Sequence, residues 1–271
     1  MIELPTICGV GLGYRSPHHD DLLGDESASR PPWLEVLADN FLFGGVPLAK
    51  LKQICERYPV VLHCVGSNIA GVDGPDADYL KRVKKLFREI GAQWISDHLC
   101  WTRHGNVNHY DLLPLLYNKE LLELCSENIK KIQDVMGKAL VVENVSAYHG
   151  FTQSEMTEAE FLKELNSKTG CELLLDVNNI IVNENNLGID RYEFLESVKD
   201  IPVRQMHVAG HRKDAVLWID DHGSSVDNDT LGLLKHALDI FPNSPVLLEW
   251  DNNVPDYATL KTEIVRIGQA V

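Results

Sequence analysis

The sequence predicts a single-domain α/β protein, a (β/α)8 TIM barrel over residues 1–271, for three reasons. Short apolar segments alternate with longer segments of helical periodicity, which is typical of a parallel sheet. Eight such units occur, and eight favour a closed barrel over an open doubly wound sheet. The length and the apolar content of 44% suit one large core, because barrels of this class often run to about 250 residues.

The predicted strands are short and rich in leucine and β-branched residues, as expected where both faces of a sheet are buried. They are 6–13, 33–38, 60–65, 94–99, 139–145, 172–177, 203–208 and 246–250. Helices are predicted at 46–57, 76–90, 118–136, 157–168, 190–200, 228–240 and 256–269.

Two helix starts carry local signals, and two connections stand out by their composition or length. Thr157 and Glu160 resemble a capping box, and Asp190 is placed to cap the next helix. Segment 15–32 is polar and poorly periodic, so it is predicted as a loop with at most one short helix. Segment 100–117 is longer than a typical connection, and long loops of a barrel usually lie at its functional face.

The charge and the cysteines exclude several classes of protein. A net charge of −15 argues against binding of nucleic acid, which needs clustered lysine and arginine. The start MIELPTICGVGLGYR has no signal-peptide pattern and no long apolar run follows, so we expect a cytoplasmic protein with no membrane contact. None of the six cysteines forms a CxxC pair, which favours reduced thiols over a thiolate metal site.

Single ionisable residues interrupt six consecutive apolar strands at or near their C-terminal ends. These residues are His63, His98, Glu143, Asp176, His207 and Glu249. Each follows the previous one after roughly one β/α unit, so we expect all six to surround one mouth of the barrel.

Carboxylates in apolar strands must be neutralised, because burying each one without a partner costs several kcal/mol. A ring of buried salt bridges would do this, but Arg204 is the only basic residue within these strands that could take part. Bound cations neutralise carboxylates directly, and histidine with carboxylate ligands suits iron, manganese or zinc. The sequence therefore predicts a metal centre at the mouth.

Further residues near the strand ends extend this prediction. Asp220 and His222 have a spacing that lets both side chains point the same way, and with Asn179 they could form a third, weaker site. A hydrogen-bonded loop is the alternative for Asp220 and His222. Glu35 and Asn40, near the end of the second strand, are candidates for orienting a ligand or the substrate, and an ion pair is the alternative for Glu35.

The motifs also resemble, in order and over nearly the whole chain, those of the DUF692 family of multinuclear non-haem iron-dependent oxidative enzymes. They are GVGLGYR, HCVGSNIAG, SDHLCW, VVENVSAY, LLLDVNNIIVN, QMHVAGH, IDDHG and VLLEWDNNVP. The segment LLPLLYN (112–118) departs from the family's usual LPLPYT-like sequence, beside the expected mouth.

The resemblance implies a barrel related to xylose isomerase and endonuclease IV, two or three iron ions, and O₂-dependent modification of a cysteine in a ribosomally made precursor peptide. It also implies a small partner protein that presents the peptide, as in methanobactin biosynthesis and related natural-product pathways. By resemblance, one metal is held by His63, His98 and Glu143, a second by Glu143, Asp176, His207 and Glu249, and a third by Asn179, Asp220 and His222.

Three other functions remain open at this point. Several metals close together can also clamp a phosphate and activate water, as in a phosphodiesterase or endonuclease. A sugar isomerase would use two divalent ions without O₂ or a partner protein. A metal-binding scaffold without catalytic activity is the third alternative.

Overall fold

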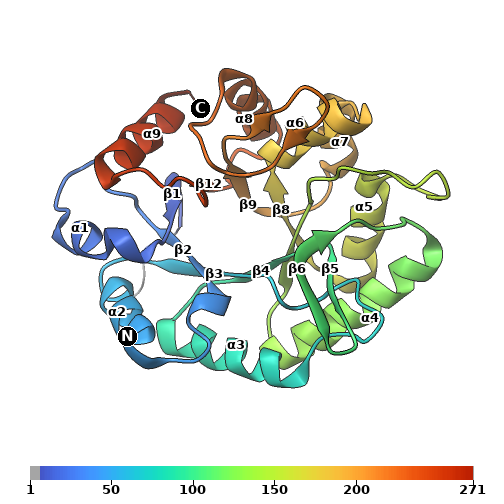
Figure 1. Ribbon diagram of the computed structural model, residues 1–271, viewed down its shortest axis with the longest axis horizontal. Coiled ribbons are helices and arrows are strands. Elements are labelled where there is room, and N and C mark those ends of the chain that lie inside the picture. Colours follow the sequence, from blue (N-terminus) through green and yellow to red (C-terminus); the bar gives the residue numbers. More distant parts are fainter. Residues whose placement is uncertain (1–6, 271) are drawn as a thin grey trace.

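The eight predicted strands form one closed parallel barrel, in the order β1-β12-β9-β8-β7-β4-β3-β2 (Figure 1). The computed structural model describes residues 7–270, apart from the side chain of Tyr110, so Thr6 of the first predicted strand lies outside it. The barrel strands are β1 (Val10–Gly13), β2 (Leu34–Leu37), β3 (Val60–Cys64), β4 (Ile95–His98), β7 (Leu140–Glu143), β8 (Glu172–Asp176), β9 (Val203–Val208) and β12 (Val246–Leu248). The predicted TIM barrel is therefore confirmed.

The seven predicted helices are present and pack around the barrel as its outer layer (Figure 1). They are α2 (Gly45–Cys55), α3 (Ala77–Ile90), α4 (Lys119–Met136), α5 (Glu158–Thr169), α7 (Arg191–Val198), α8 (Asn228–Ile240) and α9 (Tyr257–Ala270). Thr157 and Glu160 form the predicted capping box at the start of α5, and the Asp190 side chain caps α7. None of the helices described within 7–270 is long and apolar enough to cross a bilayer.

One helix was not predicted, and it follows β8 directly. Helix α6 (Val177–Leu187) has the sequence VNNIIVNENNL, in which the asparagines have poor helix propensity. The Asp176 side chain caps its first turn by accepting a hydrogen bond from the Asn179 amide, 2.6 Å away. Tertiary contacts stabilise the rest, because the helix buries its apolar residues and the Asn183 amide group donates to the Val145 carbonyl.

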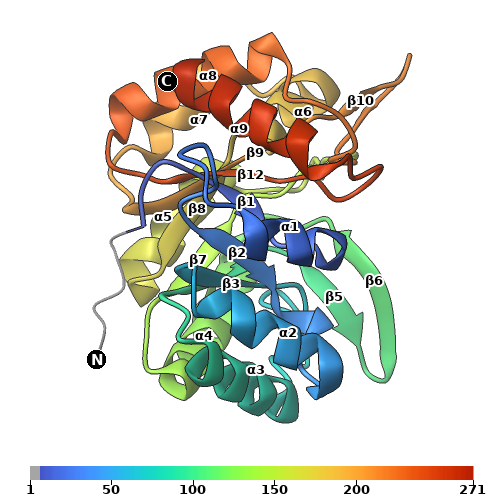
Figure 2. The ribbon, with the colours of Figure 1, turned by 90° about the vertical axis from the view of Figure 1, so that its left-hand side faces the viewer.

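Two hairpins extend the barrel at one end. Segment 100–117, predicted as a long loop, contains β5 (Trp101–His104) paired with β6 (Val107–Leu113). A shorter hairpin pairs β10 (Arg212–Lys213) with β11 (Trp218–Ile219). Both project from the same side of the barrel in Figure 2. The first connection, predicted as a loop with at most one short helix, holds a 3-10 turn (Ser16–His18) and one short helix, α1 (His19–Gly24).

The core has two parts, one inside the barrel and one between the strands and the helices. At the N-terminal end of the barrel, Trp33 packs with Val61 and Leu247, and Trp94 covers this cluster. Gly11 in β1 is required here, because a Cβ atom at this position would overlap the Trp33 ring.

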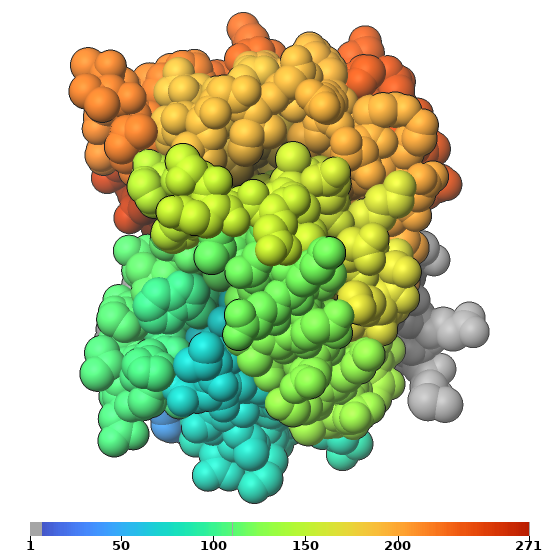
Figure 3. Space-filling view, turned by 90° about the vertical axis from the view of Figure 1, so that its right-hand side faces the viewer, coloured from blue at the N-terminus to red at the C-terminus, as the bar shows by residue number. Residues whose placement is uncertain are grey.

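On the outside, the connection after β7 and helix α5, coloured yellow-green to yellow in Figure 3, lies between the green and the orange parts of the chain.

Replacing Gly11 by alanine should lower the free energy of unfolding by about 1–3 kcal/mol, because the fully buried Trp33 ring must shift. Gly232→Ala in α8 is the matched control, since its added Cβ meets no atom and alanine favours a helix by about 0.5–1 kcal/mol. Urea unfolding measures both changes. Equal stability of the two variants would show that the Gly11–Trp33 contact is not tightly packed.

Candidate metal centre

Four of the six ionisable residues predicted at the strand ends, His63, His98, Glu143 and Glu249, line one cleft of about 530 Å³ at the C-terminal end of the barrel. The other two, Asp176 and His207, are fully buried beside them. Its walls come from the strand ends, from β6 and from the loops that follow β7, β11 and β12. Eight carboxylate residues line the cleft, and Arg15 is the only lysine or arginine among its described lining residues. The space is therefore strongly acidic in the absence of bound cations.

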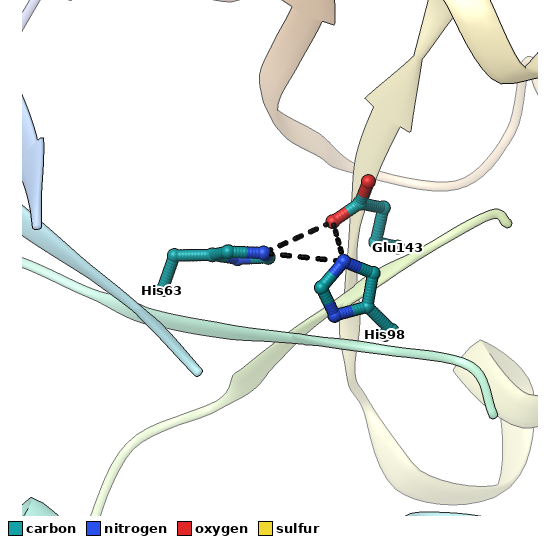
Figure 4. A group of neighbouring side chains, drawn as sticks. All are labelled: His63, His98 and Glu143. Carbon is teal, nitrogen blue, oxygen red and sulfur yellow. Dashed lines mark hydrogen bonds and ion pairs between the residues drawn. The ribbon is translucent and has the colours of Figure 1, made fainter. Parts of the chain in front are cut away.

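The first group of ligand-type side chains joins β3, β4 and β7 (Figure 4). The Glu143 Oε2 atom lies 3.5 Å from the Nε2 atoms of both His63 and His98. The two Nε2 atoms are 3.4 Å apart. The three side chains converge on a common point, and Glu143 Oε2 has no hydrogen-bond partner although it is buried.

The second group shares Glu143 with the first. The Nδ1 atom of His207 lies 2.9 Å from Glu249 Oε2, 3.9 Å from Glu143 Oε1 and 4.0 Å from Asp176 Oδ2. The two oxygens of Glu143 thus face different groups. His207 and Asp176 have 0% exposed surface. Asp176 Oδ2 has no hydrogen-bond partner, and His207 Nδ1 lies near Glu249 Oε2 without the alignment of a hydrogen bond.

The third group lies on the loop after β11. The Nε2 atom of His222 is 2.5 Å from Asp220 Oδ1, and His222 Nδ1 is 3.5 Å from Glu249 Oε2. His222, Asp176 and Glu249 offer ligand atoms that all lie within 4.8 Å of one another. The buried Asn179 Oδ1 atom also lacks a partner, and Asn179 lines the same cleft.

Unpartnered buried polar atoms are rare in folded proteins, because each costs roughly 1–3 kcal/mol. In this cleft they are concentrated on the residues that have ligand chemistry: Glu143, Asp176, Asn179, His98, His207 and His222. Imidazole nitrogen and carboxylate oxygen are ligands for iron, manganese and zinc. The donor set therefore fits a centre of several metal ions.

Burial shifts the pKa values in the metal-free cleft, and neighbouring charges oppose it at several residues. It raises the pKa of Glu143 to about 7, and together with the nearby Glu143 charge it raises the pKa of Asp176 well above the usual value. Burial and the neighbouring His98 hold the pKa of His63 well below the usual range. Burial also lowers the pKa of His98, but Glu143 and Asp97 outweigh it and raise this pKa to about 9.

Hydrogen bonds behind the ligand-type atoms fix the rings. The His63 Nδ1 atom lies 2.8 Å from the Ser96 hydroxyl, which orients Nε2 toward Glu143. The His222 Nδ1 atom lies 3.2 Å from Asp251 Oδ2, and Asp251 also pairs with Arg15 at the rim. Such partners behind a ligand set its tautomer and orientation.

A second set of hydrogen bonds holds the carboxylates of the third and second groups. Asp220 accepts from Ser146, at 3.1 Å, and from the Asn178 amide group, at 2.7 Å. The Asn144 side chain bonds both backbone groups of Asp176, with its Nδ2 atom 3.0 Å from the carbonyl oxygen and its Oδ1 atom 2.9 Å from the amide nitrogen. These bonds keep the carboxylates in place although their charges repel.

The structure places the two remaining candidates differently. Glu35 is buried inside the barrel, with Oε2 3.1 Å from His207 Nε2, on the side of that ring away from Glu249. Asn40 does not reach the cleft, because the 3-10 turn Ala38–Asn40 carries it outward, where its exposed side chain lines a separate hollow beside Phe41. The expectation that Asn40 takes part in the site is therefore corrected.

Sequence reasoning missed several residues that hold the site: Ser96, Asn144, Asn178, Gln205 and Asp251. Two of them carried a usable signal. Gln205 is two residues before His207 in a strand, so both side chains face the same side. Asp251 is two residues after Glu249.

A protein-family model described as the RiPP precursor modification enzyme MbnB/TglH/ChrH matches residues 9–271. RiPPs are ribosomally synthesised and post-translationally modified peptides. A UPF0276 protein of Caulobacter vibrioides is 40% identical over 266 residues, covering 97% of this chain and 94% of that protein. A UPF0276 protein of Rhizorhabdus wittichii is 40% identical over 255 residues, covering 94% of this chain and 91% of that protein.

Solved structures with similar folds are much more distant in sequence. A D-allulose 3-epimerase from Methylomonas has a TM-score of 0.66 at 12% identity, covering 99% of both chains. Endonuclease IV from Thermus thermophilus has a TM-score of 0.56 at 13% identity, covering 98% of both chains. These likenesses show the xylose isomerase-like barrel alone, whereas the family model and the relatives show that the chain belongs to the MbnB/TglH/ChrH family (DUF692/UPF0276) of RiPP precursor modification enzymes.

Proposed function

We propose that this protein binds two or three iron ions and uses O₂ to oxidise a cysteine of a ribosomally made precursor peptide. The observation that carries the proposal is the sharing of Glu143 between two groups of ligand-type atoms, one oxygen facing each group. A shared carboxylate brings two metals close enough to act on one substrate. Family membership supplies the class of substrate, a RiPP precursor peptide.

The proposed ligand sets follow the three groups of the cleft. His63, His98 and Glu143 hold one metal, and Glu143, Asp176, His207 and Glu249 hold the second. The third set is Asn179, Asp220 and His222, with Glu249 close enough to His222 to contribute. Because Asn179 offers a neutral oxygen and the loop offers less support than a strand end, the third ion is expected to bind most weakly.

When bound, the irons supply coordination of the peptide thiolate and the oxidation by O₂. The protein's own residues would bind the metals, orient the ligand side chains and shield the centre from water. The strand ends exclude water from the buried atoms of Glu143 and His207, and the arginine–aspartate pair Arg15–Asp251 stands at the rim. A cleft of about 530 Å³ accommodates a cysteine with its neighbouring residues, but not a folded domain.

The proposal extends to a small separate protein that presents the peptide, as the resemblance implies. The hairpin β5–β6 stands beside the cleft, since Asn108, Asp111 and Leu112 of β6 line it. A presented peptide would have to pass this hairpin to reach the metals.

Metal analysis of protein loaded with iron under anaerobic conditions tests the ligand sets. The wild type should hold two to three irons per chain, and Glu143→Gln should lose at least one, because one shared ligand serves two ions. Glu158→Gln is the matched control: Glu158 is also a buried glutamate with a pKa raised by burial to about 7, but it bonds the Val145 amide outside the cleft. Equal loss in both variants, or zinc or manganese in place of iron, would contradict the assignment.

Metal binding should release protons and become tighter as the pH rises from about 6 to 8. At pH 6 the metal-free Glu143, with a pKa near 7, is mostly protonated, and His98, with a pKa near 9, carries a proton. Both must lose these protons to bind a cation, so the association constant should rise by up to about tenfold per pH unit for each proton released, and the contribution of Glu143 should level off above pH 7. Calorimetric titration in two buffers of different ionisation enthalpy measures the protons released; a pH-independent affinity would refute this electrostatic description.

Peptide oxidation is tested by mass spectrometry with the precursor peptide encoded near the gene, the partner protein and a reductant. The peptide mass should change only with O₂, and a Cys→Ser peptide should stay unmodified because it lacks the thiol. Identical products with and without O₂ would rule out the oxidative step. Activity on a free sugar or on abasic-site DNA would instead favour an isomerase or an endonuclease.

A further inference from the structure

Two apolar hollows lie outside the hairpin β5–β6, next to the metal cleft. One, of about 780 Å³, lies between the hairpin, the loop after β3 and the first half of α4. The other, of about 550 Å³, lies between the loop after β7 and the helices α6 and α7. Pro114, Leu115 and Phe151 line both hollows, so the two form one continuous space, which we call the outer trough.

The outer trough joins the metal cleft. Ser146 lines both the cleft and the second hollow. The hairpin separates the cleft from the first hollow, because successive side chains of β5 face opposite sides: Thr102 lines the cleft, whereas Trp101 and Arg103 line the hollow. A chain that places one side chain in the cleft can therefore continue past Ser146 into the outer trough.

The walls of the outer trough suit apolar side chains. Six of its large apolar residues are only half-buried: Trp101, Leu116, Leu121, Leu124, Phe151 and Ile189. A concave apolar surface of this kind, open to water, is typical of a binding site, because a bound chain removes it from solvent.

The charge of the outer trough is mostly negative. Its described lining residues include five carboxylate residues but, among lysine and arginine, only Arg103. Glu120 and Glu127 flank Leu121 and Leu124 on one face of α4, are exposed, and form no ion pair with any residue described within 7–270. An apolar segment that carries lysine or arginine is therefore complementary to this surface.

A second route out of the cleft has the opposite charge. The hollow beside Phe41, of about 490 Å³, shares Arg15 with the cleft. Its charged residues are Arg15 and Lys50, and none of its described lining residues is a carboxylate. A basic segment is disfavoured there and favoured in the outer trough.

We propose that the outer trough binds the part of the precursor peptide next to the modified cysteine, as an apolar segment that carries lysine or arginine. The inference rests on the proposed function, because it takes the peptide as the substrate. It adds that recognition of the peptide is separate from the metals: the cleft receives the cysteine, and the outer trough holds the neighbouring residues.

Fluorescence anisotropy tests the proposal without O₂ or turnover. The probes are short overlapping segments of the precursor peptide encoded near the gene, labelled and with Cys→Ser. The segment that binds most tightly should be apolar, carry lysine or arginine and lie next to the cysteine position. Leu124→Gln should weaken it roughly tenfold, and Glu127→Lys about fivefold. Only the effect of Glu127→Lys should disappear at about 1 M salt, where charges are screened.

Three control variants should bind this segment like the wild type. Asp134→Lys makes the same change of charge at an exposed position of α4 outside the outer trough, and Leu238→Gln replaces a half-buried leucine of α8. Lys50→Glu alters the rival hollow beside Phe41. Full affinity in both Leu124→Gln and Glu127→Lys, or a loss in Lys50→Glu alone, would overturn the proposal. So would variants that bind every segment normally but no longer bind the partner protein.

Hydrogen exchange locates the bound segment without any substitution. Exchange should slow at 113–124 and 147–151; slowing confined to 14–17 or to the hairpin β10–β11 would overturn the proposal. The iron content of Leu124→Gln and Glu127→Lys should equal that of the wild type, because neither residue lines the cleft. A wild type without iron would refute the proposed function, and segment binding, which is measured separately, would still decide between the outer trough and its rivals.

Discussion

The crowding of carboxylates inside the barrel is the constraint on which the rest of the structure depends. Glu35, Glu143, Asp176 and Glu249 are buried at one end of the barrel, and Arg15, the only arginine among the described residues that line the cleft, is engaged with Asp251 at its rim. Without cations this end of the barrel must hold protons instead, as the raised pKa of Glu143 indicates. Bound metals would favour the charged form of the carboxylates over the protonated form, which the low-dielectric interior otherwise favours. The arrangement of carboxylates therefore favours binding of cations, and it makes the protein less stable when no cation is bound.

The strands of the barrel hold these carboxylates and the neighbouring histidines at fixed positions. Parallel strands place their C-terminal ends at one rim, so β3, β4, β7, β8 and β9 each bring a ligand-type residue to one cluster of side chains, and Glu249 follows β12 directly. Neighbouring strands also support one another, since Asn144 beyond β7 bonds both backbone groups of Asp176 at the end of β8. A rigid set of strand ends allows Glu143 to face two groups at once, which a flexible loop would not maintain. The less regular third group, on the loop after β11, relies on Ser146, Asn178 and Asp251 for its position.

Much of this arrangement could be predicted from the sequence, because isolated His, Glu and Asp residues stand out in apolar strands and recur once per β/α unit. The same reasoning could not place Asn40, since a single turn after β2 decides whether it points into the cleft or away from it. Helix α6 was missed because asparagine-rich segments are poor helices in isolation, and its stability comes from tertiary hydrogen bonds such as that from Asn183 to Val145. Gln205 shares a strand face with His207, but a neutral amide adds no charge to the pattern, and its partners Trp94 and Glu35 come from distant parts of the chain.

Family membership indicates the class of enzyme, and the geometry of the cleft indicates which residues would bind metal. The family model gives the class of enzyme, while the distant epimerases and endonuclease IV share only the barrel. What is particular to the proposed chemistry is two irons joined by one carboxylate. Electron paramagnetic resonance of the iron-loaded, partly oxidised protein tests this claim most directly. If Glu143 joins two irons, the wild type should give a signal from magnetically coupled irons that disappears in Glu143→Gln. A wild type showing only the signals of isolated ferric ions would contradict a shared carboxylate.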